Sequence, residues 1–233
     1  MQHLGVLKEG ERRRLVAMAP AGVQRLSKQL RVSVQRGAGR AAGYSDDAYA
    51  QAGATLMEHR DEILRGCDLV LGHDSHYRGE DIGGPKTFIG FLNVLNEREV
   101  VEHYRRPGIT LHSLDLIPRT TLAQAMDVLS SVASISGYQA VLLAAERSLA
   151  TVPMITSAGG TLRPARFLIM GAGVAGLQAI ATARRLGAIV RAYDVRSASR
   201  TEVESLGATF IEVEGAVEDR KAGGYAVEQT PEH

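Results

Sequence analysis

The sequence feature that most constrains the fold is the run Gly171-Ala-Gly173-Val-Ala-Gly176, which stands between an apolar segment and a helical one. Three glycines at this spacing are typical of the turn that joins strand to helix in a parallel βαβ unit. Gly171 permits the tight turn, Gly173 leaves the backbone open to close approach, and Gly176 lets the helix pack closely on the strand. The spacing predicts a strand over 166–170 and a helix over 174–186.

An acidic residue narrows the chemistry of this turn. Asp194 follows a second predicted strand, 189–193, at the spacing that the dinucleotide fingerprint requires. The free N–H groups at Val174 and Ala175, where the helix begins, suit a diphosphate. A carboxylate at Asp194 suits both hydroxyls of an adenosine ribose and would repel a 2′-phosphate, which favours NAD(H) over NADP(H). Arg196, two residues later, weakens that preference.

A glycine-rich turn alone is a weak indicator, because such turns occur in many folds. An ordinary structural turn is therefore the alternative interpretation. Strand, turn, helix, second strand and acid all agree in this sequence, and their agreement favours a nucleotide site.

Composition excludes several classes of function. The chain has 233 residues, 45% of them hydrophobic, enough for an ordinary core. Its 27 Lys and Arg nearly balance 26 Asp and Glu, so no general attraction to nucleic acid is expected. A single cysteine, Cys67, excludes an internal disulfide and fits a reducing compartment. We assign no metal, since His73 and His76 are more simply solvated, and we expect no segment that spans a membrane.

Along the rest of the chain, short apolar runs alternate with helical stretches, which predicts a parallel α/β layer. The predicted strands are 3–7, 30–34, 69–71, 87–91, 109–111 and 209–213, and the predicted helices are 21–29, 46–52, 57–64, 97–104 and 199–206. The segment 121–146 is typical of a long, mostly buried helix, and 156–164 of a loop. The expected fold class is α/β, with two Rossmann-like parallel-sheet domains joined by a long helix. The expected divisions are an N-terminal domain over 1–120, a linking helix and loop over 121–160, and a partial nucleotide-binding domain over 161–233.

The surroundings of the glycines resemble a known family. The stretch FLIMGAGVAGLQAIATARRLGAIVRAYDVR is similar to the alpha subunit of proton-translocating NAD(P) transhydrogenase, whose relative is alanine dehydrogenase. IPRTTLAQAMDVLSSVASISGYQAVLLAA and PMITSAGGTLRPAR resemble the segments that precede the glycine turn in that family. RVSVQRGAGRAAGYSDDAYAQAGA extends the likeness toward the N-terminus. The resemblance therefore covers nearly the whole chain.

The resemblance implies a nicotinamide-contacting group of four polar residues, which correspond to Arg119, Gln124, Asp127 and Ser130. A cation, an amide, a carboxylate and a hydroxyl together are able to orient a carboxamide and exclude water near a hydride-transfer position. On the residues alone, the better interpretation is an ordinary polar helix start with a solvated arginine. The family likeness is what favours a site.

The resemblance also extends the cofactor contacts beyond Asp194 to Val195 and Arg196. GGYAVEQTPEH resembles the beginning of the family's mobile loop, with Tyr225 as its tip residue. In the family the nucleotide domain continues through further strands, so the sequence predicts a second domain that is incomplete and a chain that is truncated at its C-terminus.

Amino-acid oxidation is the less favoured activity. In the dehydrogenase branch an arginine and a lysine hold the substrate carboxylate and a histidine transfers a proton, and those positions correspond here to Leu15, Gly72 and Asn93. The resemblance instead implies hydride transfer between NAD(H) and NADP(H), coupled to proton translocation. The implied partners are NADP(H)-binding and membrane subunits, with a homodimer of this chain on the cytoplasmic side, peripheral to the inner membrane. A noncatalytic NAD-binding or assembly fragment is the alternative.

Overall fold

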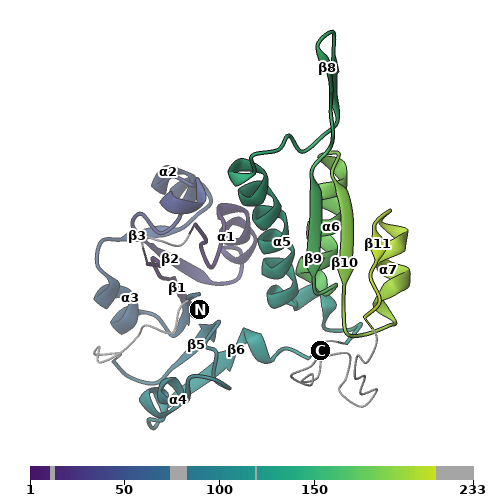
Figure 1. Ribbon diagram of the computed structural model, residues 1–233. Coiled ribbons are helices and arrows are strands. Elements are labelled where there is room, and N and C mark those ends of the chain that lie inside the picture. The colour runs from purple at the N-terminus through teal and green to yellow at the C-terminus, as the bar shows by residue number, and fades with distance from the viewer. Residues whose placement is uncertain (11–13, 74–82, 119, 214–233) are drawn as a thin grey trace. The chain divides into compact units, whose positions relative to one another are not determined.

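The computed structural model describes residues 1–10, 14–73, 83–118 and 120–213 (Figure 1). The chain divides into two compact units, residues 1–127 and 128–233. Both are α/β units with parallel sheets, as the alternation of strand and helix patterns predicts. The hypothesis of two Rossmann-like sheets is confirmed at this level.

The first unit is built on a six-stranded sheet in the order β3-β2-β1-β4-β5-β6, in which every pairing is parallel. The strands are β1 (His3–Val6), β2 (Arg31–Gln35), β3 (Thr55–Met57), β4 (Leu69–Leu71), β5 (Lys86–Gly90) and β6 (Ile109–Ser113). This order is typical of doubly wound folds, in which the connections reverse direction between β1 and β4. Ligands in such folds bind outside the carboxyl ends of the strands.

Short helices connect these strands. They are α1 (Pro20–Leu26), α2 (Asp46–Gln51), α3 (Arg60–Gly66) and α4 (Arg98–Tyr104), with 3₁₀ turns η1 (Arg40–Ala42), η2 (Leu114–Leu116) and η3 (Gln124–Met126). The expected helix over 57–64 is wrong at its start, because Thr55–Met57 pairs with β2 as a strand. The helix begins at Arg60 because Glu62 accepts hydrogen bonds from the backbone N–H groups of Glu58 and His59.

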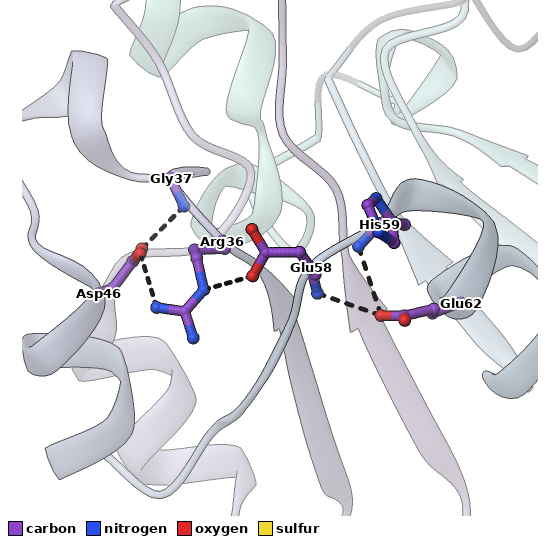
Figure 2. Close-up of polar contacts among 6 residues, drawn as sticks. All are labelled: Arg36, Gly37, Asp46, Glu58, His59 and Glu62. Carbon is purple, nitrogen blue, oxygen red and sulfur yellow. Dashed lines mark hydrogen bonds and ion pairs between the residues drawn. The ribbon is translucent and has the colours of Figure 1, made fainter.

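Polar side chains fasten the carboxyl ends of β2 and β3 (Figure 2). Arg36 donates from Nε to Glu58 at 2.8 Å and lies 3.6 Å from an Asp46 oxygen. Asp46 also accepts from the backbone N–H of Gly37 at 2.8 Å, and Gly37 has a φ of 74° that favours glycine. Exposed ion pairs contribute about 0 to 1 kcal/mol each, so this group chiefly orients the loop between β2 and α2.

The second unit begins with α5 (Val128–Arg147) and an antiparallel hairpin, β7 (Ile155–Ser157) and β8 (Gly160–Leu162). A three-stranded parallel sheet in the order β11-β10-β9 follows, with β9 (Arg166–Met170), β10 (Ile189–Tyr193) and β11 (Thr209–Phe210). Its helices are α6 (Val174–Arg185) and α7 (Ser199–Ser205). The predicted strands 166–170 and 189–193 are confirmed to the residue. The expected loop over 156–164 is wrong, because Ile155–Ser157 and Gly160–Leu162 pair across a turn.

Helix α5 differs from its prediction in three respects. It starts at Val128 rather than 121, because the preceding residues form turns and η3. It is not mostly buried: in the described part of the chain it buries Gly137 and Val141, and most of its other residues are partly or fully exposed. At 20 residues it is also long and apolar enough, by length and composition, to cross a membrane, contrary to the expectation. Its buried face packs on α6, so the exposed apolar face requires another explanation.

The core of the second unit consists mainly of small side chains. Ala179, Ile180 and Ala183 of α6 pack with Val190 and Ala192 of β10 in one buried cluster. Small residues bring α6 close to the sheet, as the third glycine of the turn requires. The core therefore fixes the position of the helix whose first turn follows the glycines.

Candidate functional site

The glycine turn has the geometry that the sequence predicts. Gly171 has a φ of 95°, which a side chain would strain, and its N–H donates to the Tyr193 carbonyl at 2.7 Å. A Cβ on Gly176 would strike the Gly171 carbonyl, whose carbon would lie 2.8 Å away. Gly173 is different, because no heavy atom of the described chain lies within 4 Å of where its Cβ would be. The turn is therefore tight on its protein side and open at Gly173.

The start of α6 is available to an anion. Gly173 is the N-cap residue, and among the described residues no side chain caps this helix end. Val174 is exposed and Ala175 is half-buried. The first N–H groups of a helix lack partners within the helix and attract negative charge. These residues therefore fit the diphosphate of a dinucleotide.

Asp194 is the buried carboxylate behind this turn, with its side chain 7% exposed. Its Oδ2 accepts from the backbone N–H of Ala172 at 2.6 Å, and its Oδ1 accepts from the backbone N–H of Arg196 at 2.9 Å. The Arg196 guanidinium donates to both oxygens, from Nε at 2.9 Å and from Nη2 at 3.0 Å. This forked pair is the strong form of a charged hydrogen bond. It ties the turn to the end of β10.

The electrostatics keep this carboxyl ionised. Burial opposes ionisation, but the hydrogen bonds from Arg196 and from the Ala172 amide outweigh it and hold the pKa of Asp194 below its ordinary value. The hydrogen bond to Asp194 in turn raises the pKa of Arg196. Both groups are therefore charged at neutral pH.

The hydrogen bonds also limit what Asp194 is able to accept. A carboxylate has about four acceptor positions, and four donors already occupy them. A ribose diol is therefore able to bind Asp194 only in place of the Arg196 guanidinium. Sequence reasoning placed Arg196 beside the ribose but missed this pair, although an aspartate and an arginine two residues apart were the visible signal.

The residues expected at the nicotinamide end are described only in some positions. Arg119 and Tyr225 lie outside the described residues. Gln124 is exposed at the start of η3, and the half-buried Asp127 follows that turn directly. Ser130 is half-buried in the first turn of α5. Gln124 and Asp127 fall in the first unit and Ser130 in the second, so their role stays a prediction.

The positions expected to hold an amino-acid substrate carry other structural roles. Asn93 has a φ of 48°, donates to Glu97 at 3.3 Å and accepts from Asn96 at 2.8 Å, so its amide organises the start of α4. Leu15 lines a cavity of about 230 Å³ at the carboxyl ends of β1 and β2. Leu15 offers no charge to a substrate carboxylate.

Asp115 is a carboxylate that sequence reasoning missed. It accepts from the Ser113 hydroxyl and from the backbone N–H of Leu92 at 3.1 Å. Burial opposes its ionisation, yet these hydrogen bonds hold the pKa of Asp115 below its ordinary value. It joins the loops that follow β5 and β6, and the sequence carries no motif that would have indicated it.

Metal ligands do not gather in the described ranges, where no three His, Cys, Asp or Glu side chains are grouped to hold an ion. His73 belongs to these ranges, and its backbone N–H donates to Glu9. His76 lies outside the described residues.

Comparison with known families matches both units. The profile described as "Alanine dehydrogenase/PNT, N-terminal domain" matches residues 5–136, and "Alanine dehydrogenase/PNT, C-terminal domain" matches residues 140–230. The chain belongs to the alanine dehydrogenase/PNT family. The resemblance seen in the sequence around the glycine turn is thereby confirmed.

Individual relatives agree. The chain is 41% identical over 227 residues to an NAD(P) transhydrogenase alpha subunit of Rhodospirillum rubrum, covering 93% of this chain and 59% of that protein. The solved structure of transhydrogenase from Sinorhizobium meliloti is 38% identical with a TM-score of 0.86, over 91% of this chain and 62% of that one. An L-alanine dehydrogenase structure at 23% identity has a TM-score of 0.79, over 92% of this chain and 62% of that one, and shows the shared fold alone. The chain thus spans about 60% of the length of these relatives.

Two glycine variants separate ligand contact from chain packing. Gly173→Ala adds a methyl group to open space, so we expect unchanged stability and nucleotide binding weaker by at least about tenfold. Gly176→Ala presses a methyl group against the Gly171 carbonyl and is expected to lower the free energy of unfolding by about 1–3 kcal/mol. Urea unfolding and NADH titration measure both effects. Unaltered NADH binding by Gly173→Ala would show that no ligand passes close to this turn.

Proposed function

We propose that this chain is the NAD(H)-binding component of a transhydrogenase, in which hydride passes between NAD(H) and NADP(H) held by a partner subunit. The observation that carries the proposal is the open glycine turn with Asp194 fastened behind it. Membership of the alanine dehydrogenase/PNT family supports it, as does the likeness to subunits named as transhydrogenase alpha.

The residues divide the work along the dinucleotide. Bound NAD(H) supplies the hydride donor or acceptor. The start of α6 at Val174 and Ala175 binds the diphosphate, and Asp194 takes the adenosine ribose as Arg196 releases it, beside Val195. Arg119, Gln124, Asp127 and Ser130 orient the carboxamide and exclude water. Direct transfer between two nicotinamide rings needs no general base, so positioning supplies the catalysis.

The wider assembly follows from the same proposal. NADP(H) is bound by a separate subunit, and membrane subunits couple the exchange to proton translocation. This chain lies on the cytoplasmic side and reaches the inner membrane through those partners rather than by its own span. The packing of α5 on α6 supports that placement, because one face of the helix is already covered by protein.

We further propose that α5 and the hairpin form a homodimer surface. Exposed apolar side chains gather on these two elements of the second unit, namely Ile135, Tyr138, Leu143, Met154, Ile155 and Leu162. Exposed apolar residues grouped in this way are typical of protein interfaces. A second copy of the chain would also cover the apolar face of α5.

A noncatalytic NAD-binding or assembly module is the second candidate. One observation favours it: in the described part of the second unit, β9 is an edge strand with Leu168 58% and Met170 77% exposed. An apolar edge of a parallel sheet invites a further strand. Such a module would bind nucleotide without turnover.

A transhydrogenation assay decides between the two candidates. We expect the purified chain, mixed with the NADP(H)-binding and membrane subunits of a transhydrogenase, to support reduction of an NADP analogue by NADH. The control omits this chain. NADH binding without any rate above that control would favour the noncatalytic module, and alanine-dependent reduction of NAD would restore the amino-acid dehydrogenase.

Substitutions at the two ends of the dinucleotide are expected to differ in size. Asp194→Ala removes the ribose contact and the partner of a half-buried guanidinium, so it should weaken NADH binding by about tenfold or more. Arg119→Ala should weaken binding less, because its contact is confined to the nicotinamide end. Calorimetric titration with NADH measures both. The reverse order would mean that the cofactor lies elsewhere.

The dimer surface is tested with Tyr138→Asp, which places a charge among exposed apolar side chains of α5. We expect the wild-type chain to sediment as a dimer and the variant as a monomer, because desolvating an unpaired carboxylate is costly. The matched control is Gln24→Asp on exposed α1 of the first unit. A wild-type monomer at micromolar concentration would contradict the proposed surface.

A further inference from the structure

Helix α5 meets the start of α6 at a single glycine. Gly137 is buried, and a Cβ built on it would strike the carbonyl oxygen of Ala175, with the carbonyl carbon 2.9 Å and the Cα 3.1 Å away. These are backbone atoms, which have no flexible side chain to move aside. Ala175 belongs to the first turn of α6, the turn that offers its N–H groups at the glycine loop. Only glycine permits this approach.

The two helices run in the same direction. Gly137 lies against the beginning of α6, while the segment that follows α5 lies at the other end of that helix. There, a Cβ on Gly187, two residues after α6, would lie 3.0 Å from Pro153. The Ala165 N–H also donates to the carbonyls of Thr151 and Val152, where the chain enters β9. Figure 1 shows α5 beside α6 in this arrangement.

This direction determines where the first turn of α5 lies. Ser130 stands seven residues before Gly137, two turns earlier on the same face, so it lies about 10 Å further along the axis. Because the helices are parallel, that displacement carries Ser130 past the start of α6, to the side on which a diphosphate would bind. The nicotinamide riboside of a dinucleotide extends from its phosphate over a comparable distance.

We propose that Gly137 is a positioning residue for dinucleotide binding: it sets how far the first turn of α6 lies from Ser130. The diphosphate end and the nicotinamide end of the ligand are then held at one spacing by a single backbone contact. This inference rests on the proposed binding of NAD(H). A methyl group at position 137 would push the two helices apart and displace the N–H groups of Val174 and Ala175 from the phosphates.

The test compares Gly137→Ala with Val141→Ala. Val141 is buried one turn further along α5, so its truncation weakens the same helix pair without pressing on the start of α6. We expect Gly137→Ala to weaken NADH binding by at least about tenfold, since a displacement near 1 Å is able to cost this much, and Val141→Ala to change it by less than about twofold. NADH affinity unchanged in folded Gly137→Ala would overturn the proposal.

A second readout separates positioning from simple loss of folded protein. Gly137→Ala should weaken binding of ADP, whose phosphates meet α6, and leave binding of adenosine unchanged, because the ribose contact lies on β10. Equal losses for ADP and adenosine would mean a general structural defect and overturn the proposal. A wild-type chain that binds no NADH would instead overturn the proposed function itself.

A measurement on the wild-type chain serves where Gly137→Ala does not fold. Amide hydrogen exchange is followed with and without NADH. The proposal predicts slower exchange in α5 around Gly137 as well as in the first turn of α6, because the ligand holds both helices at one spacing. Protection confined to 171–177 and 193–196 would contradict it.

Discussion

The hydrogen bond from the Ala172 N–H to Asp194 is the interaction on which the candidate site depends. It joins the glycine turn after β9 to the residue that ends β10, so the two halves of a nucleotide site are positioned by one buried carboxylate. A buried carboxylate without donors would cost several kcal/mol, and Asp194 avoids that cost through two backbone N–H groups and the fork of Arg196. The site is therefore organised before any ligand arrives.

The pairing of Asp194 with Arg196 has a consequence for ligand choice. In the structure the guanidinium occupies the carboxylate oxygens that a ribose diol would use. Binding of a ribose thus exchanges one set of donors for another, and the released cation is held nearby. A cation at that place moderates the repulsion that Asp194 exerts on a 2′-phosphate, which explains physically why an aspartate followed by Arg196 is a weaker determinant than an aspartate alone.

Much of the second unit could be predicted from the sequence, because glycine spacing and strand punctuation are local signals. β9 and β10 begin and end where the pattern places them, and Gly171 and Gly176 have the steric roles that the motif assigns. Three features escaped because they depend on tertiary contacts. The hairpin at 155–162 carries no strong strand pattern, β3 is only three residues long, and the value of Gly137 lies in its contact with another helix.

The nicotinamide end was less predictable for the same reason. Gln124, Asp127 and Ser130 are ordinary polar residues near a helix start, and only a family likeness gives them a role. Helix α5 looked like a buried linker because its composition is apolar, yet most of its surface is exposed and its one close contact is made by a residue without a side chain. Composition indicates what a helix is able to bury, but the neighbours decide which face is covered.

The central claim is that the turn at Gly171 and the carboxylate at Asp194 form an NAD(H) site. Calorimetric titration of the wild-type chain with NADH and with NADPH under identical conditions tests it most directly. The account predicts saturable heat with NADH and binding of NADPH weaker by about tenfold or more, because the 2′-phosphate meets a carboxylate. No heat with NADH, or tighter binding of NADPH, would contradict it.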